Sequence, residues 1–443
     1  WAYEELGWGG FWAWDPVENA ALMPWLTGTA FLHSVMIQEK RNMLKIWNVV
    51  LIITTFGLTI IGTFLTRSGI INSVHSFTQS EIGPAFLIYL ALVLIAGFAL
   101  LFKRIQMLES EYKIESVLCR ENVFVAQNIL LVGIAFTVLL GTTFPLLAEA
   151  VRGTKLSIQA PFFNTITAPM GYALLILMGI GMLISWRRSS LDNLRRNFQN
   201  PLITASLGTI ILVWLLFEKS LQWGVYIIFW STIFVTSTIL FEIVKATQIK
   251  ARQNESNILM GFFYVILRNR RRYGGLMIHF GVVLMFLGFA GTFFSLEKDL
   301  TLEAGESRII GNYRLEFQNV NEFMSGNARH RAAIINVYDS DGKLLEILKP
   351  AKSFYPTQPQ PLTEVAIRRT FLEDLYLIFS SENADEKDSV TLRVFINPLV
   401  GWAWMALPIF TLGVGICMTY RPKSLKSQEI INRERYLALK EAG

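Results

Sequence analysis

The stretch Trp8-Gly-Gly-Phe-Trp-Ala-Trp-Asp-Pro-Val-Glu18 decides how the rest of the chain is interpreted. Trp favours the membrane–water interface, where its apolar ring and its polar N–H group are both satisfied. The aromatic residues do not follow a single helical stripe, and adjacent glycines allow a backbone or a planar ligand to approach closely. We therefore predict a flat aromatic platform. Its members are Trp8, Gly9, Gly10, Phe11, Trp12 and Trp14.

The end of the same stretch has the signature of a helix start. Asp15 suits the N-cap position, and Pro16 suits the first helical position. Glu18 stands where a capping box has its second carboxylate, so both acidic groups have a local structural role. We therefore predict that a helix begins at Pro16, whatever further role Asp15 has.

The composition of the whole chain is that of a membrane protein. Of its 443 residues, 52% are hydrophobic and 17% are charged, and the mean hydropathy is +0.41. The net charge of +6 comes from basic residues in short loops, which does not indicate binding to nucleic acid. Cys119 and Cys417 form no Cys-x-x-Cys motif, which excludes a thioredoxin-like redox pair and a covalent heme site of this chain's own.

About nine apolar runs are long enough to cross a membrane, since a span needs about 20 residues. They cover residues 17–37, 46–65, 84–102, 122–144, 166–185, 201–217, 224–244, 274–294 and 398–419. Lys and Arg concentrate after the first, third, fifth and seventh runs, and the positive-inside rule assigns these loops to the cytoplasm. The Trp-rich stretch and the loops 66–83 and 145–165 are then expected outside.

Residues 295–397 interrupt this pattern, because they are polar and too long for an ordinary loop. Asp341-Gly342 is a hairpin signal between two alternating runs, 333–338 and 344–348, and residues 390–396 resemble a further strand. We predict a small extracytoplasmic β-domain of about four to seven strands. Glu373 and Asp374 are expected at its surface or in a turn, and we find no catalytic constellation in it.

The predicted fold is thus an α-helical polytopic membrane protein with a β-domain inserted before the last helix. The order of its parts is an outer Trp-rich segment (1–16), a helix bundle (17–294), the β-domain (295–397), the last span (398–419) and a cytoplasmic tail (420–443).

Two of the four histidines lie inside predicted spans, where an ionisable residue suggests function. His33 comes shortly before the cytoplasmic end of its span, and His279 comes shortly after the cytoplasmic start of its own. At about 1.5 Å per residue, both lie roughly 8 Å into the membrane from the same side. Imidazoles at matched depth on two helices suit bis-histidine ligation of a b-type heme. Spacing alone leaves open that each one only forms hydrogen bonds inside the bundle.

The other two histidines are expected outside the membrane. His75 lies in the outer loop 66–80, on the side of the Trp-rich stretch, and is a candidate axial ligand over the platform. A lone loop histidine is, however, more often only solvated. His330 lies in Asn327-Ala-Arg-His-Arg-Ala332, which suggests an exposed basic turn.

Several motifs together resemble the CcmF family, the membrane subunit of the cytochrome c heme lyase. The Trp-rich stretch looks like the "WWD" signature of heme-handling proteins, and the resemblance covers essentially the whole chain, which looks like the larger C-terminal part of the family protein. The motifs that carry it are Trp8 to Ala20, Met23-Pro-Trp25, Phe31-Leu-His-Ser34, Thr66-Arg-Ser-Gly69, Ser73-Val-His-Ser-Phe77, Ile278-His-Phe-Gly281, Glu364-Val-Ala-Ile367 and Leu372-Glu-Asp-Leu-Tyr376.

The resemblance implies a function and a set of site residues. His33 and His279 would hold a transmembrane b-type heme, whose role would be to reduce the iron of the delivered heme. His75 would be the catalytic residue, as the second of two outer histidines that ligate the heme substrate. The Trp-rich segment from Trp8 to Asp15 would bind that heme. The family reaction attaches the heme vinyl groups to the two thiols of a Cys-x-x-Cys-His motif in apocytochrome c.

The resemblance also implies partners and a location. The partners would be a heme chaperone, apocytochrome c with the subunits that bind and reduce its thiols, membrane lipid and a candidate quinol donor, and no nucleic acid. The location would be the inner membrane, with the Trp-rich segment and the β-domain facing the periplasm. Arg67 and Arg152 are outer candidates for binding the heme propionates, although each also suits an ordinary loop arginine.

Two departures from the family are visible. Phe11 stands where the family often has Trp, a change that an aromatic wall tolerates. The family's first outer histidine lies in spans that precede the Trp-rich signature, so we expect either a truncated chain or a separate polypeptide that supplies it. Two other functions stay open: a heme transporter of the same Trp-rich superfamily, and a b-type cytochrome that only transfers electrons. A channel or solute carrier with bundle histidines is the simplest alternative.

Overall fold

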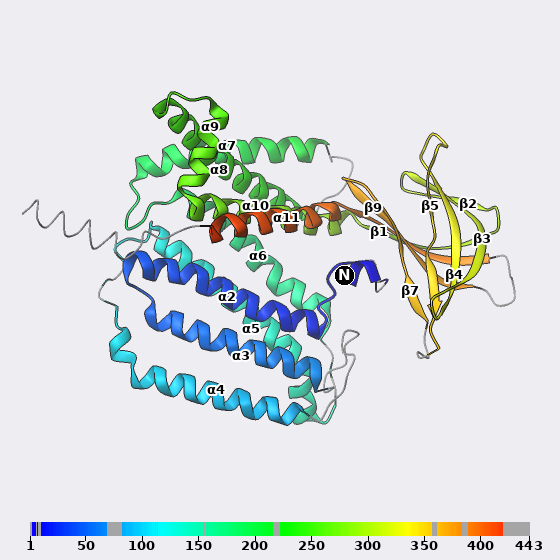
Figure 1. Cartoon of the computed structure of the whole chain (residues 1–443), viewed down its shortest axis with the longest axis horizontal. Helices are drawn as coiled ribbons and strands as arrows, with labels where there is room; N and C mark the ends of the chain where they lie inside the picture. Colours follow the sequence, from blue (N-terminus) through cyan, green and yellow to red (C-terminus); the bar gives the residue numbers. More distant parts are fainter. Residues whose placement is uncertain are drawn as a thin grey trace, which may run out of the picture. The chain divides into compact units, whose positions relative to one another are not determined.

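The structure is a computed structural model that describes residues 2–5, 7, 10–68, 82–110, 112, 114–154, 156, 158–215, 222–356, 361–382 and 389–419 (Figure 1). These residues include nine helices long and apolar enough to cross a membrane. They are α2 (Pro16–Arg41), α3 (Lys45–Arg67), α4 (Gly83–Lys103), α5 (Arg120–Arg152), α6 (Ala160–Leu183), α7 (Leu191–Leu215), α8 (Trp223–Gln253), α10 (Arg270–Ala290) and α11 (Val400–Met418). The predicted helical polytopic fold is confirmed.

Four short helices complete the helical part. They are α1 (Ala2–Glu5), η1 (Ile105–Leu108), α9 (Ile258–Arg268) and η2 (Gly291–Phe294). The chain divides into two compact units, of which the first comprises residues 1–238 and 286–401, including the β-domain. The second comprises residues 239–285 and 402–443. The predicted cytoplasmic tail, residues 420–443, lies outside the described residues.

Helix α2 begins as its sequence predicts. The Asp15 carboxylate accepts a hydrogen bond from the backbone N–H of Val17 at 2.9 Å. The Glu18 carboxylate accepts from the backbone N–H of Asp15 at 3.1 Å and from that of Ala13 at 3.0 Å. With Pro16 in the first turn, this is a complete capping box that uses the N–H groups a helix start leaves without partners.

Helix α2 is the centre of the first unit's bundle, because it packs against both α3 and α5. Gly62 allows the closest approach of α3, since a Cβ built there would lie 3.2 Å from the carbonyl oxygen of Ala20. On the α5 side, the buried Asn19 amide donates to the Thr142 hydroxyl at 3.0 Å. Between these contacts lies a continuous apolar core. It includes Met23, Leu26, Ala30, Leu51, Leu58, Leu131 and Val138.

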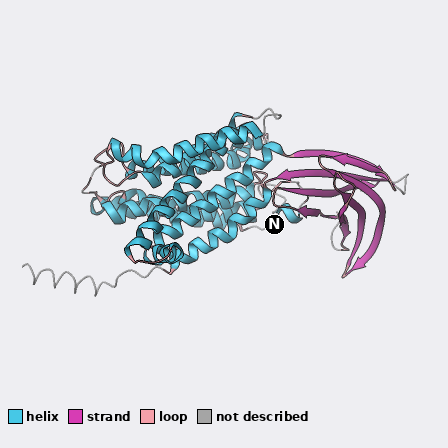
Figure 2. Ribbon diagram, turned by 90° about the horizontal axis from the view of Figure 1, so that it is seen from above, coloured by secondary structure: helices cyan, strands magenta, loops and turns pink. Residues whose placement is uncertain are grey.

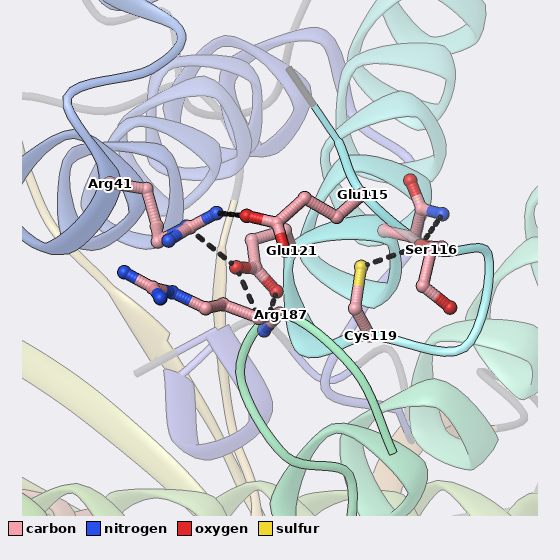
Figure 3. A network of polar contacts seen from close by, with 7 residues as sticks. Arg41, Glu115, Ser116, Cys119, Glu121 and Arg187 are labelled. Carbon is pink, nitrogen blue, oxygen red and sulfur yellow. Dashed lines mark hydrogen bonds and ion pairs between the residues drawn. The ribbon is translucent and has the colours of Figure 1, made fainter. Parts of the chain in front are cut away.

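A buried ion pair fixes the last turn of α2 to the first turn of α5 (Figure 3). Arg41 and Glu121 have side chains that are 7% and 3% exposed, and Nε of Arg41 lies 3.1 Å from the Glu121 carboxylate. A second carboxylate, Glu115, lies 2.5 Å from Nη2 of Arg41 but is 53% exposed. The Glu121 carboxylate also accepts from the backbone N–H of Arg187. Arg41 therefore has two acidic partners of very different burial.

The described strands lie together in one β-domain of the first unit (Figure 2). Ten strands are described: β1 (Leu296–Glu303), β2 (Ser307–Ile310), β3 (Tyr313–Ser325), β4 (Ala328–Tyr338), β5 (Leu344–Leu348), β6 (Ala351–Phe354), β7 (Leu362–Glu364), β8 (Ala366–Arg369), β9 (Glu373–Glu382) and β10 (Ser389–Pro398). One sheet has the order β1-β10-β9-β8, and the other has the order β2-β3-β4-β6-β7 with β5 also paired to β4. Apolar residues of both sheets form one core, as in a β-sandwich.

Three sequence expectations for the β-domain are wrong. The number of strands exceeds the predicted four to seven, because β2, β6, β7 and β8 are too short to show alternation. His330 is not in an exposed turn but is 8% exposed inside β4, stacked on Phe323. Asp374 is not a surface residue but is 1% exposed at the start of β9. His330 contacts Ser353 of β6, and Asp374 contacts Tyr3 of α1, so each is buried by a segment that is not adjacent to it in the sequence.

The buried ion pair yields a stability prediction. Glu121→Ala should lower the stability by about 3 kcal/mol, because it leaves the Arg41 charge buried beside an exposed carboxylate only. Glu115→Ala should change it by less than about 1 kcal/mol, since an exposed partner contributes little. Thermal unfolding in detergent, followed by circular dichroism, measures both. Equal losses for the two variants would show that burial of the pair does not determine its contribution.

A second prediction concerns the contact of α5 with α6. A Cβ built at Gly141 would lie 2.5 Å from Cε1 of Phe163, whose ring is 2% exposed, whereas one built at Gly133 would meet only the Met170 methyl group at 2.7 Å. Gly141→Ala should therefore cost about 1–3 kcal/mol through overpacking. Gly133→Ala, the same change on the same helix, should be neutral or slightly stabilising, because a flexible methionine can move and alanine favours a helix. The same unfolding measurement compares them.

Candidate functional site

Trp14 of the Trp-rich segment is held in place by two residues of α6. Its backbone has a φ of +58°, a left-handed conformation that is uncommon for a bulky residue and often occurs at functional sites. Its indole stacks on Phe163 of α6 with the ring centroids 4.9 Å apart and the planes 10° apart. Its Nε1–H donates to the side-chain oxygen of Asn164 at 2.7 Å. The sequence analysis missed Phe163 and Asn164, although an aromatic–amide pair at the outer start of a predicted span was a visible signal.

The described rings of the segment do not form the flat platform that the sequence predicted. Trp12 is edge-on to Trp14, with an interplanar angle of 90° and a centroid distance of 5.7 Å. Phe11 stacks on Phe289 at 5.5 Å instead. The rings are not coplanar because Trp14 is oriented by Phe163 and Phe11 is oriented by Phe289. Trp12, at 39%, is the exposed ring of the three, and a Cβ at Gly10 would meet no atom within 4 Å.

The segment before the Trp-rich stretch is attached to the β-domain. Tyr3 is 2% exposed, and its hydroxyl donates to the carboxylate of Asp374 at 3.2 Å. Glu4 forms an ion pair with Arg369. Sequence reasoning missed this contact, and the matching motif around Asp374 was its only signal. Trp8 and Gly9, which lie between this attachment and Phe11, are outside the described residues.

His33 has the environment of an oriented imidazole. Its Nδ1 lies 2.9 Å from the carbonyl oxygen of Thr29, one turn earlier in α2, so this nitrogen carries the proton as donor. Its ring is also edge-on to Phe124 of α5, at 5.5 Å between centroids. A hydrogen bond at one ring nitrogen is what fixes the other nitrogen, Nε2, for a metal. These contacts fit the predicted role as an axial heme ligand.

His279 lies on α10, in the second unit, beside a close helix contact. A Cβ at Gly274 would lie 2.7 Å from the carbonyl oxygen of Gly413, and one at Gly281 would lie 2.8 Å from the Phe410 ring, so α10 and α11 are held tightly. A Cβ at Gly275, one turn before His279, would meet no atom within 4 Å. The backbone on that side is therefore open, which fits a flat macrocycle next to the imidazole. Its pairing with His33 stays a prediction.

The structure gives less information about the remaining candidates. His75 lies outside the described residues. Arg67 and Arg152 are exposed at the ends of α3 and α5. Their contact with the heme propionates stays a prediction. Among the described residues, no group of three or more His, Cys, Asp and Glu side chains could hold a metal ion. Cys119 and Cys417 are free thiols.

His330 has acidic and hydroxyl neighbours but not the geometry of a catalytic triad. Ser353 Oγ and Glu364 Oε1 lie 2.7 Å and 3.3 Å from the same ring nitrogen, Nδ1. The Ser353 hydroxyl also donates to Glu364, and its side chain is fully buried. In a triad the acid and the nucleophile contact opposite nitrogens of the imidazole. The cluster is therefore a buried polar network of the β-domain.

Comparisons with known proteins agree with this architecture. A family model described as the CcmF C-terminal β-sandwich matches residues 293–398, and one described as Cytochrome C assembly protein matches residues 1–71. The chain is 34% identical to the cytochrome c-type biogenesis protein ccl1 of Rhodobacter capsulatus over 95% of its own length and 62% of the relative's. It is 33% identical to CcmF of Escherichia coli, over 94% of this chain and 62% of that protein.

A solved structure is similar over the same extent. The structure titled Cytochrome c Heme Lyase CcmF superposes with a TM-score of 0.75 and 31% identity, covering 95% of this chain and 62% of that one. The chain thus spans about three fifths of the length of the relatives it matches. The β-sandwich, the Trp-rich first segment and the membrane helices all fall within these matches. Over most of its own length, the chain is therefore similar to the CcmF family of cytochrome c-type biogenesis proteins.

Proposed function

We propose that this chain is the heme-positioning part of a cytochrome c heme lyase in the inner membrane. It holds heme at its Trp-rich segment while the thiols of an apocytochrome c Cys-x-x-Cys-His motif add to the vinyl groups. The observation that supports this most is the similarity to the named heme lyase over 95% of the chain. The geometry adds an exposed ring, Trp12, next to rings that are fixed by Phe163 and Phe289.

The reaction requires mainly that the protein positions the heme and the thiols relative to each other. In each attachment the S–H bond of a thiol adds across a vinyl C=C bond, so one C–S bond and one C–H bond form. The aromatic segment orients the substrate heme and excludes water from its apolar edge. His75 ligates the substrate iron, and Arg67 and Arg152 bind the anionic propionates. Asp15 serves the segment indirectly, by fixing the start of α2 directly after Trp14.

The membrane histidines have a separate role in this proposal. His33 and His279 would hold a b-type heme, and the chemistry that it would supply is reduction of the iron of the delivered heme. The protein's contribution is the hydrogen bond from Nδ1 of His33 to Thr29, which selects the tautomer that presents Nε2. On the other helix, the close contact of Gly274 with Gly413 sets the position of α10.

The proposal includes an orientation and partners. The Trp-rich segment and the β-domain face the periplasm, where a heme chaperone and apocytochrome c bind, together with the subunits that reduce its thiols. The tail after residue 419 faces the cytoplasm, in line with the positive charge of the loops on that side. A quinol from the membrane is the proposed electron donor.

A visible spectrum tests the membrane heme. The reduced-minus-oxidised spectrum of the purified chain should show a low-spin b-type heme that is lost in His33→Ala and in His279→Ala, because each removes one of two axial ligands. The spectrum should persist in His75→Ala, which serves as the matched histidine control. A colourless parent prepared with ample heme, or a spectrum that survives either membrane variant, would contradict this assignment.

Porphyrin binding tests the Trp-rich segment. Trp12→Ala should weaken the binding of zinc protoporphyrin by roughly tenfold, because it removes an exposed aromatic contact of about 1–2 kcal/mol. Trp214→Ala is the control, since Trp214 is 73% exposed but lies at the end of α7. Porphyrin fluorescence during titration of the protein measures both affinities. Equal affinities for the two variants would remove the segment from the heme site.

A further inference from the structure

We propose that Tyr3 and Glu4 are positioning residues, which clamp the leading end of the Trp-rich segment to Asp374 and Arg369 of the β-domain. The β-domain thereby helps to build the heme site and is more than a docking module. This inference rests on the proposed function, because it assumes that the segment binds heme. It differs from that proposal in assigning a role to residues that contact neither heme nor thiol.

The centre of the clamp is a buried chain of hydrogen bonds. The Asn397 amide donates to the Tyr3 hydroxyl at 3.3 Å, and that hydroxyl donates to Oδ2 of Asp374 at 3.2 Å. The Tyr3 ring lies 4.9 Å from the Tyr376 ring, between centroids. The three polar residues, Tyr3, Asp374 and Asn397, are 2%, 1% and 5% exposed. Such a network is formed only when the N-terminal segment lies on the sheet.

The clamp extends along the segment on both sides of the two residues Trp8 and Gly9. Before them, Gly7 has a φ of +68°, and a Cβ added to it would lie 3.0 Å from Cγ2 of Thr363. After them, Phe11 packs against the same apolar cluster as Tyr3. This cluster comprises Tyr3, Tyr376, Ile378, Phe395 and Val400, with Phe11, Val365 and Ile367 packed against it.

This arrangement restricts the segment before any ligand binds. A loop that is held at both ends loses fewer conformations on binding a ligand than a loop held at one end. Trp12 follows Phe11 directly, so its position relative to Trp14 depends on how Phe11 is held, by the cluster around Tyr3 and by Phe289. Loosening Tyr3 should therefore weaken porphyrin binding without removing any group that contacts porphyrin.

Protonation of Asp374 is coupled to the clamp. Burial raises the pKa of Asp374 above its usual 3.8, while the hydrogen bond from Tyr3 and the charge of Arg369 oppose this shift. Glu4, the other acid nearby, raises the same pKa. Oδ1 of Asp374 has no hydrogen-bond partner among the described residues. The carboxylate form of Asp374 therefore lacks a hydrogen bond to one of its two oxygens. Because the pKa of Asp374 is higher in the folded protein than in the unfolded chain, folding of this clamped region takes up protons, and its stability falls as pH increases above about 4.

The first test compares Tyr3→Phe with Tyr338→Phe. Both remove a tyrosine hydroxyl that donates to a carboxylate of the β-domain, but Tyr338 donates to Glu316, away from the N-terminal segment. Tyr3→Phe should weaken zinc protoporphyrin binding roughly 3- to 30-fold and increase hydrogen exchange over residues 2–14. Tyr338→Phe should change neither. Asp374→Asn, which keeps an oxygen acceptor, should retain binding and lose the pH dependence of exchange.

The second test exchanges the charges of the exposed pair. Arg369→Glu should weaken porphyrin binding, because it places two carboxylates opposite each other. Adding Glu4→Arg to the same chain should restore the affinity. This rescue would not occur if Arg369 served only the fold of the β-domain, and it stays informative if Tyr3→Phe fails to fold.

The outcomes separate this inference from the proposed function. If Trp12→Ala weakens binding while Tyr3→Phe and Arg369→Glu both leave it unchanged, the segment binds heme and the clamp has no positioning role. If Trp12→Ala also leaves binding unchanged, the heme-binding role of the segment is wrong, and the clamp inference fails with it.

Discussion

Polar groups inside a membrane bundle must find partners within the protein, because the surrounding hydrocarbon offers none. Three polar residues of α2 in the first unit follow this constraint. Asn19 reaches Thr142 of α5, and Thr27 accepts from Thr55 of α3. At the end of the helix, Arg41 lies against Glu121. Each polar contact therefore specifies one register between α2 and a neighbouring helix, which the interchangeable apolar contacts do not.

His33 is part of the same pattern. Its Nδ1 contacts the carbonyl oxygen of Thr29 in its own helix, so orienting the imidazole requires no partner from another helix. The register of α2 is set above and below it by Asn19 and Arg41. An imidazole that is oriented locally, on a helix that is fixed at both ends, is prepared for a ligand whose position has to be exact to a fraction of an ångström. This is the physical basis for the proposal that His33 is a heme ligand.

Sequence reasoning succeeded where the determining contacts are local. The capping box of α2 joins residues three apart, and the spans follow from continuous apolar runs, so both were predictable. It failed for Asp374, whose partner Tyr3 is 371 residues away. It failed for His330 for the same reason, since β6 and β7 bury it. The flatness of the aromatic segment could not be judged either, because Trp14 takes its orientation from Phe163 of α6.

The insertion of the β-domain between α10 and α11 suits a domain that supports the Trp-rich segment. The first and last strands of the domain, β1 and β10, pair with each other from Leu296 opposite Ile396 onward. Just before β1, Gly291 is so close to Pro398 that a Cβ would overlap the proline carbonyl oxygen. The chain thus leaves and returns to the helical part at one narrow junction. The sheet that starts there, β1-β10-β9-β8, is also the sheet that holds Tyr3. A displacement of Tyr3 relative to that junction therefore requires deformation of a paired, buried sheet, so the start of the Trp-rich segment is held as firmly as the sheet itself.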